Sequence, residues 1–481
     1  MAKTIRHAGG QSSLGPFVVA MSDPTDLFAY DELTRILKRE VRIAVVADSQ
    51  LAQTIDRIYR RTEQITDLAR ELGEDVGEVV DFGALGVSQG AEDAPVVKLL
   101  QSVFEDAVQV KASDIHIEPQ EKQLRIRFRI DGVLHIQTHA DPKIAPPMVQ
   151  RLKLSSGLDI SEKRLPQDGR FNMRIRDQQI DVRISTMPTQ FGESVVMRLL
   201  SRSGGTAQLA DLGLPAEMLG RIRAVIEKPN GMILVTGPTG SGKTTTLYAA
   251  LQQINTPERK IITVEDPVEY RMQGLNQVQV NEKVELTFAR VLRSTLRQDP
   301  DVILVGEIRD METAQIALRA AITGHMVLST LHTRDAASAP LRLIDMGVPH
   351  YMVAYALQGV IAQRLIRLNC ESCSEPYQPE PREAEWLREV LGADAAAGAV
   401  AGRGCQRCHS TGFSGRTGLY ELLEIDAELA ALIGEGNPGK FVGAAQAKMQ
   451  GRSLRDEAAK LVAAGRTSVA EAMRVAAQFE D

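Results

Sequence analysis

Residues 237–244 read Gly-Pro-Thr-Gly-Ser-Gly-Lys-Thr and match the phosphate-binding loop pattern GxxxxGK(S/T) at every required position. An apolar run over 232–235 precedes this stretch, and a helix-compatible run over 244–251 follows it. Glycine lets backbone N–H groups converge on phosphate oxygens, and the positive end of the following helix faces the same anion. With both flanks correct, the pattern predicts a nucleoside triphosphate site and disfavours a chance glycine-rich turn.

The loop and the start of its helix supply the candidate nucleotide contacts. We expect the Lys243 ammonium to reach the β- and γ-phosphates, and the Thr244 hydroxyl to ligate Mg²⁺. Lys243 therefore counts among the catalytic candidates as well. The expected contact residues are Gly237, Pro238, Thr239, Gly240, Ser241, Gly242, Lys243, Thr244 and Thr245.

The composition of the 481-residue chain is ordinary for a globular protein, with 43% hydrophobic and 25% charged residues. Its length allows about three domains. The formal net charge of −6 argues against a protein that coats nucleic acid. Because no apolar run approaches the length of a membrane span and the N-terminus lacks a secretory segment, we expect a cytoplasmic protein without a transmembrane segment.

The first part of the chain, residues 1–91, is expected to be a short docking module with a linker. Apolar residues recur at helical spacing between Ile55 and Leu72, which predicts a helix there. In chain order, the expected elements are a loose tail over 1–24, a helix over 26–39, a strand over 41–47, a helix from Gln50 and a linker over 81–94.

Residues 92–204 are expected to form an α+β domain. It opens with an amphipathic helix over 96–110, and Asp131-Gly132 is a hairpin turn signal. The β-like runs cover 113–119, 124–130, 170–176 and 179–185.

Residues 205–481 alternate helices with short apolar strands, which predicts a parallel sheet covered by helices. The phosphate-binding loop then lies at the carboxyl end of a strand, where open α/β sheets bind ligands. A cysteine-bearing insert over 369–412 interrupts the pattern, and 413–481 is expected to be helical. The expected strands cover 233–235, 261–264, 302–305 and 326–329.

Carboxylates follow two of these expected strands. Glu307 follows the third strand, after Gly306 at the position where phosphate-loop enzymes usually carry a metal-binding aspartate. The second strand opens into Glu265, Asp266 and Glu269. Beside Mg²⁺ and phosphate such a cluster has a chemical use, although an acidic surface turn is the alternative. We assign Glu269 as the base that polarises the attacking water, with Glu307 as its competitor or as support for the metal shell.

Two histidines flank the last expected strand, His325 before it and His332 after it. A histidine at a strand end could sense the γ-phosphate and transmit its loss. The alternative for each is a structural residue with satisfied hydrogen bonds. Both are kept as candidate nucleotide-site residues.

Four motifs, in this order, make the chain similar to the secretion and pilus-assembly ATPases. They are the phosphate-binding loop, the acidic stretch 263–270, the glycine-containing motif 304–307 and the histidine-bearing stretch 323–333. The resemblance covers about 92–425 and is specific, because phosphate-loop enzymes as a whole do not share the last three motifs. Within this family, the chain most resembles the type II secretion assembly ATPase and the mannose-sensitive pilus ATPase. The type IV pilus extension ATPase belongs to the same family.

The resemblance implies a RecA-like core after a PAS-like α+β domain, and ATP hydrolysis by a homo-hexameric ring. Its implied work is assembly of a type II secretion pseudopilus or a type IV pilus. The implied partners are an inner-membrane platform protein and the cytoplasmic domain of a bitopic membrane protein, which would hold the ring peripherally at that membrane. Some relatives have a longer N-terminal domain that binds a cyclic dinucleotide. The repeat expected for that ligand is not evident in residues 1–91, which suggests a shortened docking module.

In this family, arginines of the α+β domain complete the nucleotide site. The matching positions are Arg183 and Arg198. A guanidinium group can stabilise the charge that develops on the transferred phosphoryl group, whereas the alternative is a solvated arginine on a strand face. Arg293 and Arg297 lie four residues apart on one face of an expected helix and are weaker candidates.

All four cysteines fall in two CxxC pairs, Cys370 with Cys373 and Cys405 with Cys408, which are separated by 31 residues. Four thiolates complete a closed tetrahedral Zn²⁺ site, which leaves no open coordination position, so the metal is expected to be structural. Thioredoxin-like redox use is the alternative.

Two other functions share parts of this pattern. A nucleotide-gated assembly scaffold would not need catalytic acids, yet Glu269 and Glu307 are both present. A nucleic-acid translocase of the same core fold would need basic pore loops, and the negative net charge offers it no support. The sequence therefore favours an ATP-driven motor.

Overall fold

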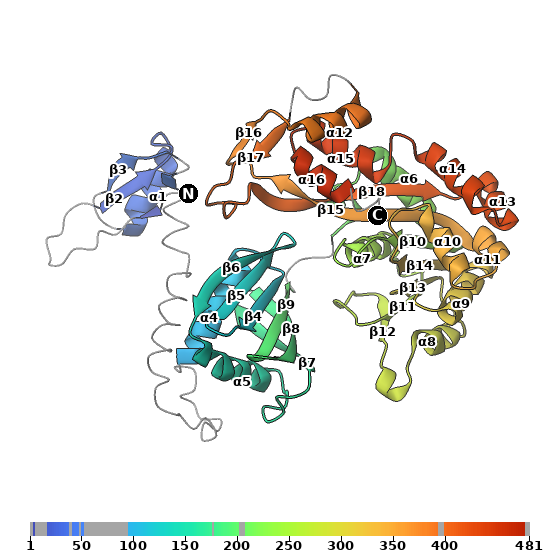
Figure 1. Cartoon of the computed structure of the whole chain (residues 1–481), viewed down its shortest axis with the longest axis horizontal. Coiled ribbons are helices and arrows are strands. Elements are labelled where there is room, and N and C mark those ends of the chain that lie inside the picture. The colour runs from blue at the N-terminus through green and yellow to red at the C-terminus, as the bar shows by residue number, and fades with distance from the viewer. Residues whose placement is uncertain are drawn as a thin grey trace. The chain divides into compact units, whose positions relative to one another are not determined.

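The computed structural model describes residues 3–4, 17–37, 41–47, 50–51, 95–175, 178–201, 207–392 and 399–476. The chain divides into two compact units (Figure 1), which are Met1–Ser203 with Gly404–Thr411, and Gly204–Arg403 with Gly412–Asp481. The expected linker over 81–94 lies outside the described residues, as does the expected helix beyond Leu51.

The first unit begins with a small sheet and one helix. In chain order the elements are β1 Lys3–Thr4, β2 Phe17–Met21, α1 Leu27–Leu37 and β3 Val41–Val45. The expected helix and strand are confirmed, but the loose tail expected over 1–24 is wrong for residues 3–4 and 17–21, which form β1 and β2. Strand β2 pairs in parallel with β3, so that Val19 and Met21 are buried beside Val41. The pairing partner lies beyond the reach of local periodicity.

An antiparallel sheet and two helices form the larger part of this unit. Its elements are α4 Pro95–Gln109, β4 Asp114–Pro119, β5 Leu124–Ile130, β6 Val133–Ala140, α5 Ala145–Ser155, β7 Gln167–Ile175, β8 Gln178–Thr189 and β9 Gly192–Ser201. The strands follow the order β6-β5-β4-β9-β8-β7, and apolar side chains from the sheet and both helices share one core. The expected Asp131-Gly132 turn joins β5 to β6 with positive φ at both residues, as tight hairpin turns require.

The second unit contains a seven-stranded sheet with the order β12-β11-β13-β14-β10-β15-β18. Neighbouring strands are parallel throughout except for the pair β15/β18. Every residue of β10, β13 and β14 is buried, because helices cover the sheet on both faces. The strands are β10 Gly231–Thr236, β11 Ile261–Glu265, β12 Leu275–Gln279, β13 Val302–Val305, β14 Met326–Leu331, β15 Leu357–Asn369 and β18 Phe413–Glu424. The helices up to β15 are α6 Ala216–Ile226, α7 Lys243–Ile254, α8 Phe288–Thr295, α9 Met311–Ile322, α10 Ser338–Asp345 and α11 His350–Ala356.

The end of the chain corrects one expectation. Residues 413–424 were expected to be helical with the rest of 413–481, but they form β18, which pairs antiparallel with β15. The pairing buries Leu419, Tyr420 and Leu423, which outweighs local helix preference. Helices follow only from Ala427, as α13 Ala427–Glu435, α14 Pro438–Met449, α15 Leu454–Ala463 and α16 Val469–Ala476. Among the described residues, no helix is both long and apolar enough to cross a membrane.

Candidate active site

The phosphate-binding loop leaves the carboxyl end of β10, and α7 begins directly after it at Lys243. Gly242 has a φ of 90° and Gly237 a φ of 147°. A Cβ at Gly237 would lie 2.4 Å from the carbonyl oxygen of Gln363 on β15, so only glycine fits there. Residues 238–240 are exposed. The loop is therefore open to solvent where α7 presents its first N–H groups to an anion.

Lys243 points into this loop. Its ammonium donates hydrogen bonds to the carbonyl oxygens of Gly237 at 2.9 Å and Pro238 at 3.1 Å. Burial lowers the pKa of Lys243 to about 8. The Glu307 carboxylate raises this pKa, and the Arg364 guanidinium lowers it further. The lysine is thus held where a phosphate oxygen can replace the loop carbonyls, and the anion would restore its full charge.

The hydroxyl groups beside Lys243 fit a bound phosphate and Mg²⁺. Among the described residues, the buried Ser241 hydroxyl has no hydrogen-bond partner. Thr244 is half-buried and Thr245 is exposed. A buried polar group without a protein partner needs an explanation, and a bound ion or water is one. Thr244 therefore stays the predicted Mg²⁺ ligand, with Ser241 as an additional phosphate or metal contact.

Glu307 and His332 lie at the same edge of the sheet. Glu307 follows β13, and its carboxylate pairs with Arg309 and lies 3.8 Å from His332 Nε2. Burial and the nearby Lys243 lower the pKa of His332, whereas Glu307 raises it. The hydrogen bond to Glu307 raises the pKa of Arg309, and the Asp266 carboxylate adds to this effect. The structure thus groups Lys243, Glu307 and His332, and adds Arg309, which the sequence did not single out.

The acidic stretch after β11 is attached to the phosphate-loop helix. Glu265 is buried and accepts hydrogen bonds from the hydroxyl groups of Tyr248 and Thr263 and from the Gln277 amide. Burial and the Glu265 carboxylate raise the pKa of Tyr248. The same Tyr248 hydroxyl accepts a 3.4 Å hydrogen bond from the Glu269 backbone N–H. Glu265 is therefore occupied within the fold, and Tyr248, which sequence reasoning missed, connects α7 to the predicted base Glu269.

The described contacts of the remaining candidates of this unit are to residues outside the loop. Arg293 on α8 pairs with Glu312 on α9, and Arg297, just after α8, donates to the backbone carbonyl of Arg293, so both exposed side chains are engaged by neighbours. His325 precedes β14 at the amino ends of the parallel strands, and its Nδ1 lies 3.0 Å from the Ala320 carbonyl oxygen. The phosphate loop follows the carboxyl ends of the same strands. His332 and His325 thus lie at opposite edges of the sheet.

The two predicted arginines of the first unit are cross-strand neighbours. Arg183 on β8 pairs directly with Arg198 on β9. The Arg198 Nε donates a 3.0 Å hydrogen bond to the Asp114 carboxylate, while 57% of its side chain stays exposed. Asp114 thus orients a guanidinium that remains accessible. Its action on a nucleotide stays a prediction.

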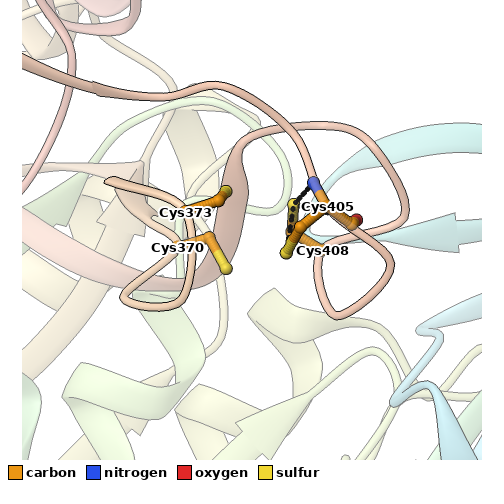
Figure 2. Close-up of side chains that lie close together, drawn as sticks. All are labelled: Cys370, Cys373, Cys405 and Cys408. Carbon is orange, nitrogen blue, oxygen red and sulfur yellow. Dashed lines mark hydrogen bonds between the residues drawn. The ribbon is translucent and has the colours of Figure 1, made fainter. Parts of the chain in front are cut away.

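The four cysteines lie together in the structure (Figure 2), with their sulfur atoms all within 4.8 Å of one another. The Cys405 and Cys408 sulfur atoms are 3.7 Å apart. Zn–S bonds of about 2.3 Å in a tetrahedron place sulfur atoms about 3.8 Å apart, so this spacing suits zinc. Cys370, Cys373 and Cys408 are buried. The residues present therefore fit a structural Zn²⁺.

Backbone contacts close the base of the cysteine segment. Cys370 N–H donates to the Gly412 carbonyl oxygen at 2.9 Å, and Arg403 N–H donates to that of Cys373 at 3.1 Å. Gly402 and Gly412 approach so closely that a Cβ at Gly402 would lie 2.0 Å from the Gly412 carbonyl oxygen. These contacts hold together the two ends of the segment between the cysteine pairs. They help to offset the entropy lost when this long loop is closed.

Comparison with known proteins decides the family. The family described as "Type II/IV secretion system protein" matches residues 89–474, and an "MshEN domain" matches residues 15–65. The chain belongs to the type II/IV secretion system protein family. The prediction of a RecA-like phosphate-loop fold is confirmed, as is the enzyme class, an ATPase.

Individual relatives cover most of the chain. The type II secretion system ATPase E of Vibrio cholerae is 43% identical over 463 residues, which are 94% of this chain and 90% of the relative. The type II secretion system protein E of Pseudomonas aeruginosa is 42% identical over 467 residues, 95% of this chain and 91% of that protein. These matches bear out the resemblance to the type II secretion branch.

Two solved structures share the fold. The pilus retraction motor PilT with bound ADP is 27% identical with a TM-score of 0.53, covering 78% of this chain and 96% of its own. The Legionella pneumophila ATPase DotB, 21% identical with a TM-score of 0.57, covers 79% of this chain and 95% of its own.

Proposed function

We propose that this ATPase works as a hexameric ring that hydrolyses MgATP to drive assembly of a type II secretion pseudopilus or a type IV pilus. The observation that carries the proposal is the convergence of Lys243, Glu307 and His332 around the open phosphate loop. The relatives that match over most of the chain are named for type II secretion, and PilT is named as a pilus motor.

In the proposed reaction the loop N–H groups and Lys243 hold the β- and γ-phosphates, and Thr244 ligates Mg²⁺. Glu269 polarises the attacking water, and Tyr248 and Glu265 fix the start of the segment that carries Glu269. Glu307 and His332 lie beside Lys243, where loss of the γ-phosphate changes the local charge. Such a charge change can be passed to the strands that carry these residues.

The ring is proposed from the resemblance to the secretion and pilus-assembly ATPases, in which arginines of the α+β domain complete the nucleotide site. Arg183 and Arg198 of the domain at 92–204 would add positive charge to the transferred phosphoryl group on the domain at 205–481. Arg198 suits this role, because Asp114 orients it while leaving it exposed. Removal of such an arginine typically lowers turnover by about 10³-fold or more.

The proposed location is the cytoplasmic face of the inner membrane, reached through protein partners. Residues 1–91 would dock on the cytoplasmic domain of a bitopic membrane protein, and the ring would act on an inner-membrane platform protein. A second candidate, a nucleotide-gated scaffold, differs in predicting binding without turnover. A nucleic-acid translocase is disfavoured by the net charge of −6.

The decisive experiment measures phosphate release and oligomeric state together. We expect the purified full chain to hydrolyse MgATP, with turnover per chain rising as rings form. Lys243→Ala should abolish turnover, and the matched surface variant Lys228→Ala should retain it. A chain that forms rings and binds MgATP with no turnover, even with its membrane partners, contradicts the motor and supports the scaffold.

A further inference from the structure

Gln363 is a fully buried amide on β15 that contacts the end of the phosphate loop and the first turn of α7. Only 1% of the residue is exposed. Its Nε2 donates a 2.7 Å hydrogen bond to the Ser241 carbonyl oxygen, and its Oε1 accepts a 2.8 Å hydrogen bond from the Thr246 hydroxyl. One side chain, far away in sequence, thus joins the end of the loop to the first turn of α7.

The bond to Ser241 has a directional consequence. The Ser241 carbonyl and the Gly242 N–H belong to one trans peptide plane, in which the two groups point in opposite directions. When Gln363 holds the carbonyl, the Gly242 N–H is turned away from β15. That N–H is one of the loop groups available to a phosphate oxygen. The Gln363 side chain thereby sets the direction of the Gly242 N–H without a hydrogen bond to it.

Gly242 is shaped to admit the amide. It has a φ of 90°, and a Cβ there would lie 2.8 Å from Gln363 Nε2. The backbone of Gln363 also lies close to the start of the loop, since a Cβ at Gly237 would lie 2.4 Å from the Gln363 carbonyl oxygen. Glycine at both positions thus lets β15 approach the loop from behind.

We propose that Gln363 is a positioning residue that orients the loop N–H groups for the triphosphate. The proposal rests on the proposed function only in taking the loop as the nucleotide site. Since Gln363 acts through the Ser241–Gly242 peptide, its loss should weaken the binding of both ATP and ADP. It should affect the chemical step less, because the predicted base lies on another strand.

The test replaces the amide by its isostere in Gln363→Glu. The new carboxylate can still accept a hydrogen bond from the Thr246 hydroxyl. It repels the Ser241 carbonyl oxygen, and its negative charge lies close to the loop that binds the phosphates. We expect the dissociation constants of MgATP and MgADP to rise about tenfold or more. A factor of this size corresponds to loss of the charge-assisted hydrogen bond between the Gly242 N–H and a phosphate oxygen. Without nucleotide the variant should melt below the wild type, because a buried carboxylate facing a carbonyl oxygen is costly, so affinities are compared at a temperature where both chains are folded. The matched control Thr246→Val keeps the Ser241 contact and should change affinity less than about threefold.

A pH series separates positioning from simple stability. Burial raises the pKa of a carboxyl group, and in Gln363→Glu the protonated carboxyl group regains an O–H donor for the Ser241 carbonyl oxygen. The ratio of variant to wild-type dissociation constants should therefore fall from pH 8 towards pH 6. If Gln363→Glu destabilises the chain, Gln363→Met gives a second, uncharged variant without either hydrogen bond, and it should also bind nucleotide weakly.

The outcomes are distinct. Unchanged nucleotide affinity in folded Gln363→Glu or Gln363→Met overturns the proposal, as does a defect in Gln363→Glu that is independent of pH. Failure of the wild-type chain to bind MgATP would instead remove the proposed function. Weak binding in both Gln363 variants, with near-normal binding in Thr246→Val, supports the assignment.

Discussion

The Tyr248 hydroxyl, on the helix that starts at Lys243, donates a hydrogen bond to the buried Glu265 carboxylate at the end of β11. The Tyr270 ring packs edge-to-face on Tyr248, with 4.6 Å between ring centroids. The phosphate-loop helix and the acidic segment are thus joined by a polar and an aromatic contact. Movement of one therefore bears on the position of the other.

Tyr248→Phe should lower kcat more than it changes KM for MgATP. The variant removes a buried hydrogen bond to a carboxylate, which is worth about 2 kcal/mol of folding stability, and releases the Glu269 backbone. Steady-state kinetics and thermal unfolding check both effects. Tyr270→Phe keeps the ring contact and the Glu265 bond, so it serves as the control and should behave like the wild type. Equal kcat values in both variants would refute the link.

The value of kcat/KM for MgATP should fall as the pH rises through about 8. Lys243 carries its charge below its pKa and loses it above, and burial lowers that pKa to about 8 in the free enzyme. A pH–rate profile between 6.5 and about 9.5 measures this. Lys243→Arg, which stays charged over the range, should lack the alkaline decline. A flat wild-type profile would show that the lysine titrates elsewhere.

Glu269→Gln should bind MgATP with nearly wild-type affinity but lose hydrolysis by about 10²-fold or more, because an amide cannot act as a base. Glu307→Gln, in contrast, should weaken the binding of MgATP, since the Glu307 carboxylate pairs with Arg309 and lies next to Lys243. Nucleotide titration and phosphate release on both variants separate the two roles. Normal turnover by Glu269→Gln means that the base is another residue.

The two histidines should differ in their effect on nucleotide affinity. His332 lies beside Glu307 and Lys243, whereas His325 lies at the opposite edge of the sheet. We expect His332→Ala to raise the MgATP dissociation constant several-fold, and His325→Ala to leave it unchanged. The reverse pattern in a binding titration would place the nucleotide elsewhere on the unit.

Zinc removal should destabilise the segment around residues 370–408 without chemistry at the metal. Four cysteine ligands would fill the coordination sphere of a bound zinc, so the metal is expected to act only through the fold. Metal analysis should find one zinc per chain, and its removal should lower the melting temperature by about 5 °C or more. Cys408→Ser should reproduce the loss, while Ser410→Ala should not. Unaltered melting after confirmed loss of zinc argues against a structural role.

Much of the candidate site could be predicted from local sequence motifs. The phosphate loop, the acidic stretch and the CxxC pairs each combine neighbours in sequence whose spacing already specifies their chemistry. The strand 413–424 could not be predicted in this way, because its conformation depends on pairing with β15, a segment about 50 residues earlier. The same holds for residues 17–21, which form a strand only beside β3.

The sequence by itself determined the nucleotide chemistry, the two cysteine pairs and the family, because these reside in short residue patterns. Only the tertiary structure decided which residues share the edge where the loop opens. It brought His332 to Lys243 and put His325 about 20 Å away, since a six-residue strand separates them. It also revealed Gln363 and Tyr248, whose contacts span 122 and 17 residues of sequence. Such contacts depend on how strands and helices pack, which no local pattern records.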